Sequence, residues 1–109
     1  MAIHALDAMT AAADHHNLLF ENDDVRILDT NVKPGEQTPV HAHEWPAALY
    51  VISWSDFIRR DPDGAVMVDS RDRKIGGDGA GLWLPPLPPH SIENIGDTDL
   101  HIIAIEVKR

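Results

Sequence analysis

The sequence contains no cysteine. Disulfide bonds, thiolate metal ligands and a cysteine nucleophile are therefore excluded, and this composition suits a reducing compartment. Basic residues are also scarce, because 9 lysines and arginines stand against 18 aspartates and glutamates, which gives a formal net charge of −9. Nucleic acid phosphates and anionic lipid surfaces would repel so acidic a chain, so neither is an expected partner.

Long hydrophobic runs are missing as well. The longest uncharged stretches, residues 45–55 and 80–92, are too short to span a bilayer, and the second is rich in proline. The first residues show neither the basic region nor the apolar region of a signal peptide. We therefore expect a cytoplasmic protein without a membrane segment. Its 109 residues suffice for one domain with a single core.

Short apolar segments separated by turn sequences dominate the chain after residue 17. Residues 18–21 and 25–32 flank Asn-Asp-Asp, and residues 56–60 and 65–69 flank Asp-Pro-Asp-Gly, so each pair predicts a β-hairpin. No long segment has helical periodicity, and no repeat of 20–50 residues is present. This pattern predicts an all-β sandwich or barrel. Residues 1–17 are interpreted as an N-terminal arm, and residues 18–109 as the β domain.

Histidines are the main candidates for chemistry. In His41-Ala42-His43 one residue separates the two imidazoles, so an extended chain would project both from the same face. Imidazole is the commonest protein ligand of transition metals. If His90 approaches from a neighbouring strand, three nitrogens could hold one metal ion and leave further coordination positions open. The alternative is that all three are ordinary polar loop residues.

Two separated blocks of residues resemble the paired motifs of the cupin superfamily. The first motif has glycine, five residues and His-x-His; the second has glycine, five residues, proline, and then histidine and asparagine at fixed distances. The matching positions are Gly35, His41, His43, Gly79, Pro85, His90 and Asn94. The resemblance covers residues 18–109. Two departures stand out: the motif glutamate falls on Ala47 or Ala48, and the second glycine of the later motif is Leu87.

The resemblance implies a single-domain cupin-type jelly-roll β-barrel, often a homodimer, with a divalent transition metal held by His41, His43 and His90. Because the motif carboxylate is missing, water or a ligand would complete the coordination. Iron, manganese, nickel, copper and zinc all remain open, since ligand type alone does not select among them. Three-histidine sites in this superfamily are associated with non-haem iron dioxygenases acting on thiols, diketones or aromatic diols.

Four other residues are candidates for the ligand pocket. Trp45 and Tyr50 are aromatic residues close to the first motif. Arg26 and Glu106 are charged residues within otherwise apolar strands, and a charge that points into a barrel needs a partner there. The remaining histidines are expected outside the site, three in the arm and one facing outward from the last strand. They are His4, His15, His16 and His101.

These features favour a metal-dependent dioxygenase acting on a small polar or anionic molecule. Two alternatives remain. One is a non-catalytic small-molecule-binding or sensor protein built on the same barrel, with or without metal. The other is a metal-free isomerase or lyase that uses a buried acid such as Glu106.

Overall fold

The computed structural model describes residues 5–72 and 76–108. A single helical turn precedes the strands, and a short 3-10 turn, Ser70–Asp72, follows the sixth strand. The elements are α1 Ala8–Ala11, β1 His16–Glu21, β2 Val25–Val32, β3 His41–His43, β4 Ala47–Ser53, β5 Phe57–Arg60, β6 Val66–Asp69, β7 Gly81–Leu84, β8 Leu87–Asn94 and β9 Leu100–Val107. No helix in the described ranges is long and apolar enough to cross a membrane.

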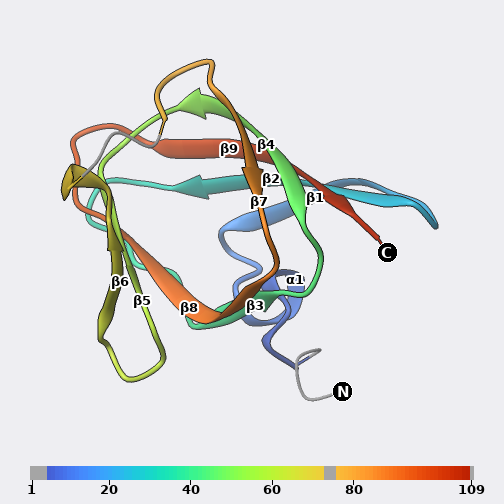
Figure 1. Cartoon of the computed structure of the whole chain (residues 1–109), viewed down its shortest axis with the longest axis horizontal. Coiled ribbons are helices and arrows are strands. Elements are labelled where there is room, and N and C mark those ends of the chain that lie inside the picture. Colours follow the sequence, from blue (N-terminus) through green and yellow to red (C-terminus); the bar gives the residue numbers. More distant parts are fainter. Residues whose placement is uncertain (1–4, 73–75, 109) are drawn as a thin grey trace.

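The strands form two antiparallel sheets that face each other (Figure 1). One sheet has the order β1-β2-β9-β4-β7 and the other the order β3-β8-β5-β6. The last strand, β9, lies between β2 and β4 in the centre of the larger sheet, and β1 forms one edge of that sheet. The predicted all-β jelly roll is therefore confirmed.

Alternation along the strands separates an inner from an outer face. On β9, Leu100, Ala104 and Glu106 are buried, whereas Ile105 between the last two is exposed. A small apolar cluster of Val32, Phe57 and Leu100 joins the two sheets. Buried polar residues on the inner faces of the strands form the site described below.

Turn chemistry fixes the two hairpins that the sequence predicts. Between β1 and β2, the Asn22 side-chain oxygen accepts hydrogen bonds from the backbone N–H groups of residues 24 and 25. Between β5 and β6, Asp61 does the same for residues 63 and 65, and Gly64 adopts a positive φ of 92°. An L side chain rarely adopts that conformation, so glycine suits the position.

The N-terminal segment packs against the barrel. Ala8 and Ala12 are buried, and α1 lies beside β3 (Figure 1). The Asp7 side chain caps α1 by accepting a hydrogen bond from the N–H of Met9, and its backbone forms a bridge with Ala42. Within the arm expected over residues 1–17, the described residues 5–15 therefore pack against β3, and residues 16 and 17 already belong to β1.

Candidate metal centre

Four imidazoles gather at one end of the space between the sheets. His16 begins β1, His41 and His43 lie on β3, and His90 lies on β8. His41 and His90 are direct cross-strand partners, with ring centroids 4.5 Å apart. His43 lies 5.1 Å from His41 and 5.5 Å from His90. His16 lies 4.9 Å from His41 and 5.6 Å from His43.

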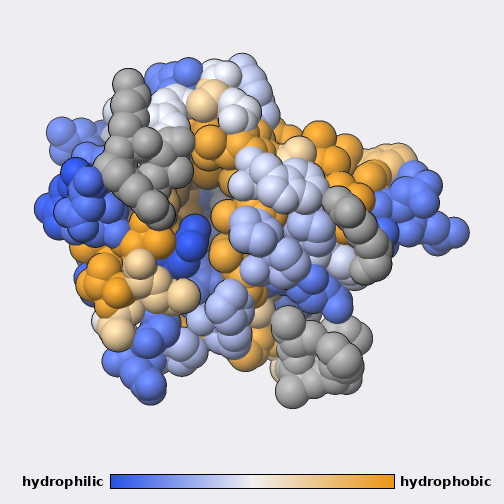
Figure 2. Space-filling model, in the orientation of Figure 1, coloured by the Kyte–Doolittle hydropathy of each residue, from blue (hydrophilic) through white to orange (hydrophobic). Residues whose placement is uncertain are grey.

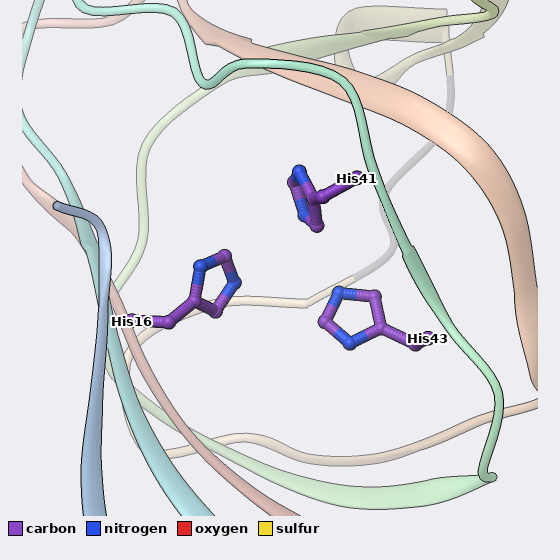
Figure 3. A group of neighbouring side chains, drawn as sticks. All are labelled: His16, His41 and His43. Atoms are coloured by element: carbon purple, nitrogen blue, oxygen red, sulfur yellow. The ribbon is translucent and has the colours of Figure 1, made fainter. Parts of the chain in front are cut away.

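Three of these rings approach closely enough to share one cation. The ligand atoms of His16, His41 and His43 all lie within 4.8 Å of one another. Figure 3 shows the three rings turned toward a common space from two different elements. Among the described residues, the group whose ligand atoms approach this closely does not include His90. The His90 ring nevertheless lies beside that of His41, next to the same space. The buried histidine cluster could therefore hold a metal ion.

Backbone carbonyls orient the two histidines that pair across the strands. Nδ1 of His41 lies 2.8 Å from the carbonyl oxygen of Pro39, and Nδ1 of His90 lies 2.7 Å from that of Pro88. A carbonyl oxygen only accepts, so Nδ1 of each ring must carry the proton. The lone pair is then on Nε2, the nitrogen that can bind a metal. Both histidines stand two residues after the proline that orients them.

The other two rings are oriented in the same sense. Nδ1 of His16 lies 3.0 Å from the carbonyl oxygen of Ala12, just after α1. Nδ1 of His43 lies 3.0 Å from the carboxylate oxygen Oε2 of Glu106. In all four rings Nδ1 therefore donates to an acceptor and Nε2 keeps its lone pair. Metal-binding histidines characteristically show such a hydrogen bond on the nitrogen that does not bind the metal.

Burial keeps most of the cluster uncharged. Removal from water lowers the pKa of His16 to about 4, that of His41 to about 3 and that of His90 to about 4, against an ordinary value of 6.5. These imidazoles are therefore neutral at pH 7. Neutral imidazole is the form that binds metal ions, so no proton has to leave these rings first.

A chain of charged groups supports one side of the centre. Glu106 is only 1% exposed and accepts a hydrogen bond of 2.6 Å from Nε of Arg26 through its second oxygen, Oε1. The same guanidinium donates two hydrogen bonds to Asp7, at 2.9 and 2.8 Å. Burial by itself would raise the pKa of Glu106, but its hydrogen bonds with His43 and Arg26 hold that pKa below its ordinary value. Glu106 is thus a buried carboxylate.

The cluster opens into a cavity of about 110 Å³ between the two sheets. Figure 2 shows the surface hollowed near the middle of the face drawn there. The polar lining consists of the four histidines, Thr30, Thr38, Arg59 and Glu106. The apolar lining consists of Val32, Trp45, Ala47, Leu49, Phe57, Leu84, Leu87, Ile92, Leu100, Ile102 and Ala104. A small molecule bound there would have a polar end beside the imidazoles and an apolar body.

The structure brings together most of the residues singled out in the sequence. Glu106 and Trp45 line the cavity together with the three predicted histidines. Arg26 lies behind Glu106, with its guanidinium carbon 5.1 Å from the centroid of the Trp45 ring. Tyr50 is not among the lining residues and is 53% exposed, because residues 47, 49 and 51 of β4 face inward and residue 50 faces outward.

Sequence reasoning placed His16 outside the site, whereas the structure puts it in the centre. Its neighbour His15 instead lies with Nδ1 3.1 Å from the carbonyl oxygen of Asn31, and His4 lies outside the described residues. His101 faces Asp29, with Nε2 2.6 Å from a carboxylate oxygen. Counting back from the turn at residues 22–24 does not find His16, because a register shift between Leu18 and Phe20 places it opposite Thr30 of β2.

The sequence matches no protein-family model, and no curated protein sequence matches it either. Solved structures, by contrast, resemble the fold over most of the chain. A cupin domain from Bordetella pertussis Tohama I is 20% identical with a TM-score of 0.69, and the match covers 86% of this chain and 92% of that one. An RmlC-like cupin family protein with a double-stranded β-helix fold from Methanocaldococcus jannaschii is 18% identical with a TM-score of 0.60, over 84% and 77%.

The polyketide cyclase RemF from Streptomyces resistomycificus is 21% identical with a TM-score of 0.57, and the match covers 89% of this chain and 67% of that one. At these identities the likeness concerns the architecture. The chain therefore has the cupin fold, a double-stranded β-helix.

Proposed function

We propose that this protein is a metal-dependent enzyme that oxidises a small molecule with dioxygen, the molecule having an anionic or chelating end and an apolar body. A divalent transition metal would be held by Nε2 atoms of His16, His41 and His43, with His90 as a fourth candidate ligand. The observation that carries the proposal is the orientation of the four rings. Each Nδ1 donates to an acceptor, and each Nε2 is left with a lone pair.

The donor set fits such an ion. The four rings are imidazoles, which suit iron, copper, nickel and zinc, and no cysteine is present to favour a thiolate site. When bound, a divalent ion with neutral ligands would supply an undiminished positive charge that attracts anionic or chelating groups and, if it is iron, a redox centre for dioxygen. The buried neutral rings therefore favour a negatively charged or chelating ligand.

The rest of the cavity selects for size and polarity. Leu49, Phe57, Ile92 and Leu100 contribute apolar walls, which exclude water and bury a carbon skeleton. A volume of about 110 Å³ restricts the part of the ligand that enters the cavity to a small group. Glu106 borders the cavity as a carboxylate whose two oxygens accept hydrogen bonds from His43 and Arg26. Its engaged oxygens favour a positioning role over that of a free base.

Metal content and oxygen consumption test the proposal. Protein purified without chelator is expected to contain about one metal ion per chain, and the iron(II)-loaded protein should consume oxygen with one class in a panel of thiols, diketones and aromatic diols. The zinc-loaded protein is the matched control, because zinc has no redox chemistry.

If the protein binds metal but consumes no oxygen with any compound of the panel, the proposed oxidation with dioxygen is overturned. The result would then favour a metal-containing binding protein. Absence of bound metal, together with no rise in the melting temperature on adding any of the five metals, would overturn the proposal altogether.

A further inference from the structure

Ala47 and Glu106 are neighbours across two strands of the larger sheet. Ala47 begins β4, and the antiparallel register pairs it directly with Glu106 on β9. Directly opposed residues in such a pair have Cβ atoms about 4.5–5.5 Å apart. Ala47 is also one of the two positions where the motif resemblance places a carboxylate that this chain lacks. A carboxylate is thus present one strand away from the position where the motif would have it.

The two oxygens of Glu106 serve different partners. Oε2 accepts from Nδ1 of His43 at 3.0 Å, and Oε1 accepts from Nε of Arg26 at 2.6 Å. Arg26 pairs with Glu106 across β2 and β9, so three adjacent strands converge on this one side chain. The carboxylate is almost fully buried and meets a donor at each oxygen. Its position and orientation are therefore fixed.

We propose that Glu106, on the strand next to the position of the motif carboxylate, is a positioning residue of the metal centre, and that it keeps the proton of His43 on Nδ1 so that Nε2 is available to the metal. The inference rests on the proposed metal centre. It assigns Glu106 an action through His43 and not direct coordination, because Oε2 already accepts from that ring.

Arg26 makes this role specific to a carboxylate. Its guanidinium only donates, and the two hydrogen bonds to Asp7 hold it in place. One oxygen at position 106 must therefore accept from Arg26. In Glu106→Gln the single amide oxygen would satisfy that charged donor and the NH₂ group would face His43. Nδ1 of His43 would then have to accept, and the proton would move to Nε2, which blocks the metal-binding nitrogen.

The test compares Glu106→Gln with Glu93→Gln. Glu93 also pairs with an arginine, Arg60, at 2.8 Å, but it does not line the cavity, so it serves as a matched control. The imidazole nitrogen resonances of metal-free protein report which nitrogen carries the proton. Competition with a chromophoric chelator gives the zinc affinity.

In the wild-type protein and in Glu93→Gln we expect His43 protonated on Nδ1. In Glu106→Gln we expect the proton on Nε2 and a zinc affinity lower by about 10–100-fold.

Three results would overturn the inference: His43 protonated on Nε2 in the wild-type protein, an unchanged proton position in Glu106→Gln, or an unchanged zinc affinity in that variant. If Glu106→Gln does not fold, the wild-type resonances still show which nitrogen of His43 carries the proton and so test the inference. They also decide it if the wild-type protein binds no metal, a result that would defeat the proposed function separately.

Discussion

Acid should destabilise the metal-free protein strongly, because three imidazoles are buried in neutral form. The unfolded chain takes up a proton on each of these histidines as the pH falls below their ordinary pKa of 6.5. The folded protein does not, because the pKa values of His16, His41 and His90 lie at about 4, 3 and 4. Protonation therefore favours the unfolded state, and stability present above pH 6.5 is lost as the pH falls toward 4.

The size of the effect follows from these values. Between pH 7 and pH 5 each imidazole lowers the free energy of unfolding by about 2 kcal/mol, and the three together lower it by about 5–6 kcal/mol. Because pH 5 lies above all three folded-state values, the result depends mainly on the ordinary pKa of histidine. Domains of this kind have about 5–15 kcal/mol of stability in total, so much of it should disappear.

Urea unfolding followed by tryptophan fluorescence, in the presence of a chelator, measures this loss at pH 7, 6 and 5. His16→Asn removes one of the three imidazoles and should reduce the loss by about a third. The lowered pKa values of Asp7 and Glu106 also cost stability in acid, but they act mainly below pH 5. A free energy of unfolding that differs by less than about 1 kcal/mol between pH 7 and pH 5 would refute the reasoning.

Three further outcomes are expected. Arg26→Met leaves the buried Glu106 and the partly buried Asp7 without their cation and should lower the free energy of unfolding by about 3–5 kcal/mol in urea titrations; a loss below about 1 kcal/mol would contradict this account. Gly96→Ala places a Cβ atom too close to Oγ of Ser55 and should cost about 1–3 kcal/mol in the same assay, whereas a neutral result would show that the turn yields. Zinc at 100 times its Kd should stabilise the wild-type protein by about 2.7 kcal/mol and His41→Ala far less, as thermal denaturation would show; equal stabilisation would exclude His41 as a ligand.

The fold was accessible to sequence reasoning because its signals are local. Asn22 and Asp61 supply turn chemistry within a few residues, and the flanking strands alternate with a period of two. His41 and His43 share a face for the same reason, since one residue separates them on an extended strand. Their neighbour His90 could be placed beside them because of the motif resemblance.

Other parts of the site depend on contacts that the local sequence does not specify. Nothing around His16 distinguishes it from His15; the docking of α1 through Asp7 and Arg26 brings it to the centre. The inward direction of Glu106 depends on the register of β9, and neighbouring strands contain register shifts such as that between Val51 and Ser53. Strand parity therefore could not be counted from the sequence, so Tyr50 was a candidate for the pocket although it faces outward.

Unequal mutability follows from the way the four rings are held. Three of them donate to backbone carbonyl oxygens, at residues 12, 39 and 88, and a substitution at these residues would not remove the carbonyl group. The fourth, His43, donates to the side chain of Glu106. Natural variation and laboratory selection can thus adjust the electron-donating strength of this centre gradually at position 106, whereas the other three supports persist as long as the backbone keeps its path.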